Sequence, residues 1–158
     1  MNNNINIRKF NINSDHWSSN WIPISYLNSL NNYKLNKSIT YLWSKDNKVN
    51  GIIRAYYINS KQIEIGDLWI NPKYRGKIYK KTEYKYSYEF LKKIINKIWN
   101  DFPNTNIITL IVSKDNISAI KLYKKFGFKV LNKNNKNFNN KYLIKIDKPM
   151  KMIFQRNI

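Results

Sequence analysis

The sequence predicts one domain, residues 1–158, of the α+β class (α/β three-layer), built on a mixed sheet of about seven strands. Two observations lead to this prediction. Short runs of alternating apolar and polar residues recur along the chain, as is typical of half-buried strands. Between two such runs, Gln62–Ile70 and Ile107–Ser113, lies a long segment with helical periodicity. A strand, a helix and a further strand imply a crossover connection, so we expect a central parallel pair flanked by helices.

The first half of the chain is expected to form a strand, a helical region and a meander of strands. Turn residues at 45–48 and 59–60 separate the later apolar runs and favour hairpins there. A proline at position 23 breaks the helical region, because proline lacks the N–H that a helix interior needs. The elements predicted in this half are strands at Ile5–Asn11, Ser38–Ser44, Val49–Ile58 and Gln62–Ile70, and two short helices within His16–Tyr33.

The second half is expected to contain two helices and four strands. A long helix at Lys80–Asn100 has apolar residues at helical spacing, and we expect this face to pack on the sheet. Asn116 is expected to cap a second helix and Gly127 to end it. The core face of the long helix comprises Tyr84, Tyr88, Leu91, Ile95 and Ile98, with Lys85, Glu89, Lys92 and Lys93 placed elsewhere. The remaining elements are strands at Ile107–Ser113, Phe128–Leu131, Tyr142–Ile146 and Lys151–Gln155, and a low-complexity loop at Asn132–Asn140.

The composition narrows the classes of partner. The chain carries a formal net charge of +20, which would attract polyanions such as nucleic acids. Its basic residues are nearly all lysines, accompanied by many asparagines and isoleucines, a combination that an AT-rich genome encodes whatever the function. A nucleic-acid partner is therefore not the favoured one, because a dedicated binder more often concentrates its basic residues on one helix or tail.

Other features favour a cytoplasmic protein without metal or thiol chemistry. No apolar run approaches the length of a membrane span and the first residues lack the apolar core of a signal peptide, so we expect no membrane partner. The absence of cysteine removes disulfides, thiolate nucleophiles and cysteine zinc sites. His16 is the only histidine, which excludes a multi-histidine metal site.

The stretch Ile63–Lys81 joins a strand to a helix, a junction at which backbone N–H groups can bind an anionic phosphate. Its core, Leu68–Lys77 with the sequence LWINPKYRGK, resembles the acetyl-coenzyme-A-binding motif of the GNAT superfamily of N-acetyltransferases. Asn116–Phe128, with the sequence NISAIKLYKKFGF, is similar to the second motif of that superfamily. The motifs occur in the family's order with a helix and a strand between them, and the resemblance covers roughly residues 5–155.

The resemblance implies a GNAT-like sheet in which acetyl-CoA binds, as co-substrate, between splayed fourth and fifth strands. The family's pyrophosphate loop maps to Arg75–Lys81, where two positions that are small in relatives are Ile78 and Lys80. Because a β-branched residue is strained at positive φ, we expect the loop to differ in conformation or to bind phosphate less closely, with nearby lysines compensating. The residues expected to contact acetyl-CoA are Leu68, Trp69, Ile70, Arg75, Gly76, Lys77, Ile78, Tyr79, Lys80, Lys81, Asn116 and Tyr123.

The implied reaction is direct attack of a neutral primary amine on the thioester, which needs a base, oxyanion donors and an acid. Glu64 is the candidate base, because some relatives carry a glutamate at this place in the fourth strand. Asp67 is the alternate and is expected on the opposite face by strand alternation. A backbone N–H near Trp69 or Ile70 would stabilise the oxyanion. Tyr123 matches the family tyrosine that protonates the coenzyme A sulfur, and core packing is its alternative role.

The sequence does not identify the acceptor, which could be a small amine, an amino-sugar or a protein. A strongly cationic chain would repel polyamines and lysine-rich tails, so we favour a small amine or an amino-sugar. Two other functions stay open: a degenerate GNAT-fold protein without catalysis, which Ile78 and Lys80 would fit, and a basic nucleic-acid-binding module. A homodimer is common in this fold and is also compatible with the sequence.

Overall fold

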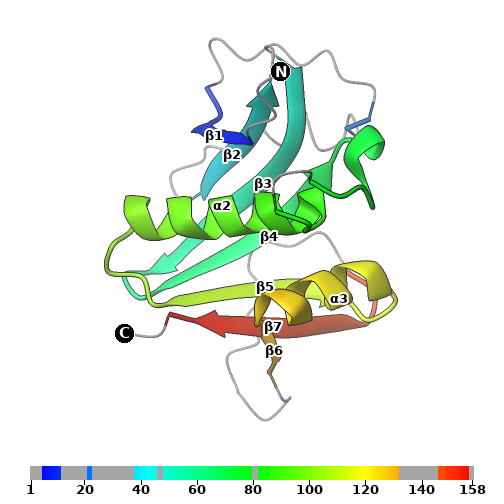
Figure 1. Ribbon diagram of the computed structural model, residues 1–158. Helices are drawn as coiled ribbons and strands as arrows, with labels where there is room; N and C mark the ends of the chain where they lie inside the picture. The colour runs from blue at the N-terminus through cyan, green and yellow to red at the C-terminus, as the bar shows by residue number, and fades with distance from the viewer. Residues whose placement is uncertain are drawn as a thin grey trace.

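The computed structural model describes residues 5–11, 21–22, 38–45, 48–79, 82–131 and 146–156. These residues form a seven-stranded sheet in the order β1-β2-β3-β4-β5-β7-β6, with helices on one face (Figure 1). The strands are β1 (Asn6–Lys9), β2 (Ser38–Lys45), β3 (Lys48–Asn59), β4 (Gln62–Ile70), β5 (Ile107–Ser113), β6 (Lys129–Val130) and β7 (Pro149–Gln155). The helices are a 3-10 turn, η1 (Pro72–Tyr74), and two α-helices, α2 (Tyr86–Asp101) and α3 (Ile117–Phe126).

The strands agree closely with the predicted ones. β4 and β5 have the predicted bounds, and β2, β3 and β4 pair in antiparallel fashion as the expected meander. The predicted helices within His16–Tyr33 lie outside the described residues except for Trp21 and Ile22. The predicted loop at Asn132–Asn140, and all of the predicted strand Tyr142–Ile146 except its last residue, lie outside them as well.

The predicted central parallel pair is confirmed, and its two strands stay together over only part of their length. β4 pairs with β5 from Gln62 with Ile107 to Ile65 with Leu110. Beyond these pairs β4 continues to Ile70 and β5 to Ser113, and the two strands diverge in Figure 1. The pairing therefore opens into a V toward the carboxyl ends of both strands.

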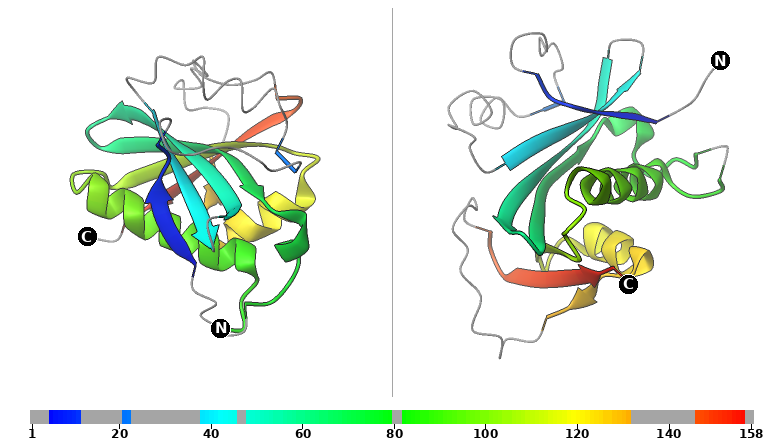
Figure 2. Two further views of the ribbon diagram at one scale, coloured as in Figure 1. Left: turned by 90° about the horizontal axis from the view of Figure 1, so that it is seen from above. Right: turned by 90° about the vertical axis from the view of Figure 1, so that its left-hand side faces the viewer.

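Helices α2 and α3 cover the same face of the sheet (Figure 2). The apolar residues of α2 form one core cluster with strand residues of that face, among them Ile53, Ile63 and Ile108. A smaller cluster of Ile22, Leu42 and Ile52 lies apart from it. Among the helices that the structure describes, none is long and apolar enough to cross a membrane.

The predicted start of the long helix is wrong. α2 begins at Tyr86, not at Lys80, because the chain first makes a small hairpin in which Ile78 pairs with Lys85. Tyr84 lies in this hairpin and is 39% exposed, whereas it was expected on the core face. Glu89, expected away from the core, is buried. Helical spacing alone cannot show where a hairpin interrupts it.

Contacts at both ends hold α2 in place. Near its start the Tyr86 ring stacks on Trp43 of β2 with 5.4 Å between ring centroids. At its end the Asp101 carboxylate accepts a hydrogen bond from the Tyr41 hydroxyl at 2.8 Å and one from the Lys97 ammonium at 2.8 Å. Lys9 of β1 adds an ion pair at 3.2 Å. The N-terminus of α2 is therefore fixed relative to the sheet.

Candidate functional site

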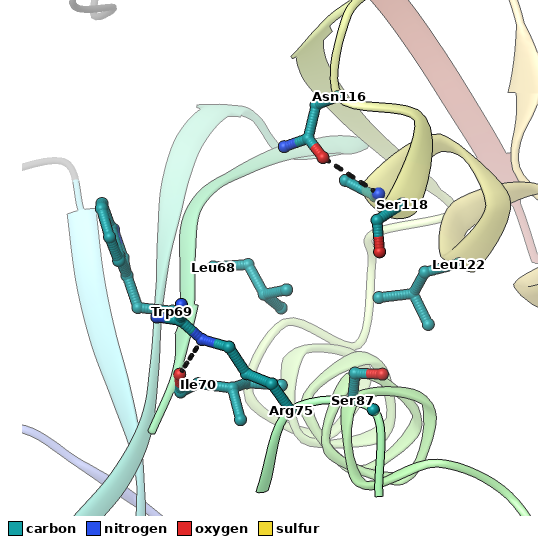
Figure 3. Close-up of a pocket in the computed structure, with 10 residues that line it drawn as sticks. Leu68, Trp69, Ile70, Arg75, Ser87, Asn116, Ser118 and Leu122 are labelled. Carbon is teal, nitrogen blue, oxygen red and sulfur yellow. Dashed lines mark hydrogen bonds between the residues drawn. The ribbon is translucent and has the colours of Figure 1, made fainter. Parts of the chain in front are cut away.

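A cavity of about 460 Å³ lies where the end of β4, the loop after it and the first turns of α2 and α3 meet (Figure 3). It opens beside the V between β4 and β5. Its lining combines apolar side chains with hydroxyls, an amide and a guanidinium. The lining residues are Leu68, Trp69, Ile70, Arg75, Gly76, Ser87, Asn116, Ser118, Ala119 and Leu122.

The structure brings about half of the predicted cofactor-contacting residues to this cavity. Those that line it are Leu68, Trp69, Ile70, Arg75, Gly76 and Asn116. Lys77, Ile78, Tyr79 and Tyr123 are not among the lining residues, and Lys80 and Lys81 lie outside the described part of the chain. The sequence analysis missed Ser87, Ser118, Ala119 and Leu122.

The missed residues have simple sequence signals. Ser118, Ala119 and Leu122 follow Asn116 within the first turns of α3, so the cap itself indicates that they share its surroundings. Ser87 was hidden because the predicted helix began too early. Once Tyr86 is known to be the first helical residue, Ser87 falls in the first turn, where a ligand can reach backbone N–H groups.

The loop after β4 is held by short local hydrogen bonds. The Asn71 side chain accepts from the Lys73 N–H at 3.1 Å and starts η1. Arg75 Nε donates to the Ile70 carbonyl at 2.8 Å, which ties the guanidinium to the end of β4 (Figure 3). Gly76 has φ of 71°, and a Cβ built there would meet no atom within 4 Å. Glycine is therefore required at position 76 by the backbone angle and not by lack of space.

The hairpin at Ile78–Lys85 changes how the loop meets the helix. The Tyr79 N–H donates to the Tyr84 carbonyl at 2.7 Å, and the Tyr86 N–H donates to the Lys77 carbonyl at 3.0 Å. Lys77 and Tyr86 are thus neighbours, although eight residues separate them in the sequence. Ile78 does not adopt positive φ, since among the described residues other than glycine only Asp67, Glu83 and Lys148 do. The Ile78 side chain is 60% exposed.

The two helix N-termini at the cavity differ in their capping. The Asn116 side chain accepts from the Ala119 N–H at 3.1 Å, which confirms the predicted cap of α3. The N-cap residue of α2, Lys85, makes no side-chain cap; the Tyr86 N–H donates to the Lys77 carbonyl instead, and the Ser87 N–H has no acceptor among the described residues. Helix N-termini carry a partial positive charge and attract anions. With Arg75 beside it, the start of α2 is the better anion site of the two.

Asp67 interrupts the regular alternation of β4. Its φ is 54°, a left-handed conformation that costs a non-glycine residue roughly 1–2 kcal/mol. Arg54 pairs with Gly66 and Ile52 with Trp69, so β4 contains one residue more than β3 between these pairs. Such an extra residue is a β-bulge and re-aims the side chains that follow it.

The bulge overturns the prediction that Asp67 and Glu64 point to opposite faces. The Tyr56 hydroxyl donates to Asp67 Oδ2 at 2.8 Å, and Arg54 Nε lies 3.8 Å from the same oxygen. Tyr56 is also the cross-strand partner of Glu64, and directly paired residues share a face of the sheet. Asp67 therefore lies on the Glu64 face, because the alternation on which the prediction rested is broken between them.

Glu64 is a buried carboxylate on β4, where it pairs with Thr109 of β5 one pair before the V opens. It is 7% exposed, accepts a hydrogen bond from Thr109 at 3.4 Å and lies 3.7 Å from the Lys151 ammonium. Burial raises the pKa of this carboxyl above its usual value, and the Lys151 charge and the Thr109 hydroxyl offset the rise only in part. A carboxylate whose pKa is raised toward neutrality is suited to accept a proton.

Tyr123 lies on α3 in the core, next in sequence to the cavity-lining Leu122. Its ring meets Phe128 edge-on with 5.7 Å between centroids. Burial raises the pKa of its hydroxyl to about 12, so the phenol keeps its proton at neutral pH. Tyr123 thus has the packing role that was its alternative, since its ring lies in the core cluster against Phe128. Its hydroxyl keeps a proton that it can donate.

Solved structures of similar fold are acetyltransferases. An acetyltransferase from Streptococcus agalactiae has a TM-score of 0.70 at 15% identity, covering 96% of this chain and 98% of that chain. A GNAT family acetyltransferase from Elizabethkingia anophelis, with acetyl-CoA bound, has a TM-score of 0.65 at 19% identity, covering 98% and 99%. A mutant spermidine N-acetyltransferase from Vibrio cholerae has a TM-score of 0.63 at 17% identity, covering 96% and 95%. These likenesses support the fold.

The sequence itself also matches a family. No curated protein gives a significant match. The model of the acetyltransferase (GNAT) family, in contrast, matches residues 8–128, which include both sequence motifs and the whole cavity. The chain therefore belongs to the acetyltransferase (GNAT) family.

Proposed function

We propose that this protein is an N-acetyltransferase that binds acetyl-CoA in the cavity between β4, α2 and α3 and transfers the acetyl group to a primary amine in a ternary complex. The observation that carries the proposal is the composition of that cavity. The cavity lies between the N-terminus of α2, which no described side chain caps, and the end of β4, which no longer pairs with β5. An anion site beside a strand that has separated from its parallel neighbour suits a ligand with a pyrophosphate and an amide-containing arm.

The pyrophosphate would bind at the start of α2. Gly76 leaves open space where a side chain would project, and its N–H has no acceptor among the described residues, whereas the N–H groups of Arg75 and Lys77 donate to the Pro72 and Tyr74 carbonyls. Ser87 contributes a hydroxyl from the first turn of the helix. The Arg75 guanidinium, anchored through Nε, keeps its remaining N–H groups for the phosphates. The exposed Lys77 adds positive charge to the same loop.

The acyl-bearing arm would lie along the edge of β4 that faces β5, beyond the last pair of these two strands. Alternate residues of a strand direct N–H and C=O groups to each edge, and the described β4–β5 pairing ends at Ile65 with Leu110. An N–H near Trp69 or Ile70 would then bind the thioester oxygen as it gains negative charge. The thioester would thereby come close to the V, with Glu64 on one of its strands.

The reaction requires two proton transfers. Glu64 would accept the proton of the acceptor amine, whose nitrogen forms a bond to the acetyl carbon while the carbon–sulfur bond breaks. Tyr123 would donate its hydroxyl proton to the departing thiolate. The pKa of Tyr123 is about 12, so its hydroxyl holds the proton that it would donate near neutral pH. Burial raises the pKa of Glu64, so the ionised fraction that can act as base should increase as the pH rises.

The acceptor is a small amine or an amino-sugar in this proposal. The net charge of +20 opposes the approach of polyamines and lysine-rich protein tails. The two described carboxylates on the face of Glu64 are each matched by a cation, since Lys151 faces Glu64 and Arg54 faces Asp67. Neither pair therefore supplies the net negative charge that a polycation needs.

A thiol-release assay with acetyl-CoA and a panel of amines tests the proposal. The wild-type protein is expected to acetylate a small amine or amino-sugar with a higher kcat/KM than spermidine or a lysine-rich peptide. Glu64→Gln should lower kcat/KM by about 10²–10⁴-fold and leave acetyl-CoA binding unchanged, because it removes only the base. Glu83→Gln, at an exposed carboxylate on the hairpin, is the control and should behave as wild type. Absence of turnover with every amine would contradict the proposal.

The pH profile identifies the base. A base acts when ionised, so the rate should rise with pH through the raised pKa of Glu64. Lys151 lowers that pKa, and Lys151→Met is therefore expected to move the acid limb of kcat/KM to higher pH. An acid limb that stays in place in both Glu64→Gln and Lys151→Met would show that another group is the base.

A further inference from the structure

Asp67 lies where β4 parts from β5, and three described features meet there. The last parallel pair is Ile65 with Leu110, two residues before it. The bulge that it forms shifts the register against β3. The residues that follow, Leu68, Trp69 and Ile70, all line the cavity. The conformation of Asp67 therefore affects the course of the cavity-lining part of β4, which separates from β5 while it stays paired with β3.

Two side chains of β3 hold the Asp67 carboxylate. Tyr56 donates to Oδ2 at 2.8 Å, and Arg54 Nε lies 3.8 Å from that oxygen. Arg54 is 3% and Tyr56 6% exposed, and Arg54 also donates to the Tyr56 hydroxyl at 3.4 Å. We call these three residues the Asp67 latch. Charge-assisted hydrogen bonds that are shielded from water are stronger and more directional than exposed ones.

We propose that Asp67 is a positioning residue of the acetyl-CoA site, whose carboxylate, held by the Asp67 latch, fixes the bulge and the course of Leu68–Ile70. This inference rests on the proposed function and replaces the alternate role of Asp67 as a base. Both contacts that the structure shows for this carboxylate, from Tyr56 and Arg54, engage Oδ2 and hold the side chain against β3. An aspartate is also among the few non-glycine residues that adopt positive φ readily.

The test compares four variants. Asp67→Gly keeps the backbone freedom and removes the latch, and Asp67→Asn keeps positive φ and an acceptor for Tyr56. Tyr56→Phe removes one hydroxyl and leaves the fold of β3 intact. Glu83→Gly is the matched control, since Glu83 is also an acidic residue at positive φ, of 62°, but is exposed and outside the latch. The readouts are amide hydrogen exchange at Leu68–Ile70 without ligand, and kcat, KM for acetyl-CoA and the pH profile.

The latch predicts faster exchange at Leu68–Ile70, by about tenfold in Asp67→Gly and less in Tyr56→Phe, with Glu83→Gly unchanged there. KM for acetyl-CoA should rise about five- to tenfold in Asp67→Gly with kcat within threefold and an unaltered pH profile. Asp67→Asn should retain most of the wild-type behaviour. Unchanged exchange in Asp67→Gly, or equal and complete loss of kcat in Asp67→Gly and Asp67→Asn, would overturn the proposal. If the wild-type protein does not bind acetyl-CoA, the proposed function fails, and hydrogen exchange still decides the role of the latch.

Discussion

The starts of α2 and α3 line one cavity, yet they are built in different ways. α3 begins at a side-chain cap, with Asn116 accepting from the Ala119 N–H. α2 begins after a hairpin, and no described side chain caps its start at Lys85. In α2 the Tyr86 N–H donates to the Lys77 carbonyl, so within the first turn of this helix it is the Ser87 N–H that has no acceptor among the described residues. Ser87 lines the cavity together with Arg75, and a helix N-terminus carries a partial positive charge. These features support placing the phosphates of acetyl-CoA at α2, with α3 as the wall of the cavity.

The largest expected effect follows from placing a carboxylate at each helix start. Ser87→Glu should weaken acetyl-CoA binding by at least about tenfold, because two like charges a few ångströms apart repel by several kcal/mol at an effective dielectric constant near 20. The same substitution should raise the free energy of unfolding by about 0.3–1 kcal/mol, since a negative charge stabilises a helix N-terminus. Calorimetric titration and thermal unfolding measure the two quantities.

Ser118→Glu is the matched variant, since Ser118 occupies the first turn of α3 and lines the same cavity. It is expected to weaken binding less than Ser87→Glu. A larger loss of affinity in Ser118→Glu would reverse the comparison and place the phosphates at α3.

An intermediate effect is expected from the loop that leads to α2. Gly76→Val forces a β-branched residue to a φ of 71°, and relaxing the loop to avoid that strain moves it away from the ligand. A strain of roughly 1–2 kcal/mol corresponds to about a five- to thirtyfold loss of acetyl-CoA affinity if the ligand must restore the angle. Because a Cβ meets no atom there, the loop is free to relax, and the free energy of unfolding of the ligand-free protein should fall by no more than that strain. Equal affinity for acetyl-CoA in wild type and Gly76→Val would show that the loop does not contact the ligand.

The smallest effect is expected at the cap of α3. Asn116→Ala removes the acceptor for the Ala119 N–H and should lower the free energy of unfolding by about 1 kcal/mol. Acetyl-CoA affinity should change by less than about threefold, because in this comparison α3 does not hold the phosphates. Denaturant unfolding measures the loss of stability, and calorimetric titration of the same preparation measures the acetyl-CoA affinity. A loss of affinity larger than that of Gly76→Val would contradict the assignment.

The sequence predicted the regular parts of the fold well because their signals are local. Alternation delimited β4 and β5, and the asparagine and glycine at the two ends of α3 marked that helix. The start of α2 was missed, since the spacing of Tyr84 and Tyr88 continues the helical pattern backward into the hairpin. Only the backbone pairing of Ile78 with Lys85 ends it, and such pairing depends on the folded chain.

The site was predicted in part for the same reason. Residues inside the two motifs, such as Arg75, Gly76 and Asn116, line the cavity as expected. Ser87 was missed because it follows the hairpin. The predicted side of Asp67 was wrong, because a bulge in β4 shifts the alternation by one residue and brings this carboxylate to Tyr56 and Arg54 of another strand. Neither contact has a signature in the local sequence.

Calorimetric titration of the wild-type protein with acetyl-CoA, at low and at high salt and beside Ser87→Glu, tests the central claim most directly. We expect one acetyl-CoA per chain, binding that persists at high salt, and a weaker affinity in the variant, since the site combines fixed backbone groups with charge. Several weak sites that disappear at high salt would indicate unspecific attraction to a cationic surface. That result, or a Ser87→Glu variant that binds as well as wild type, would contradict the placement of acetyl-CoA at the start of α2.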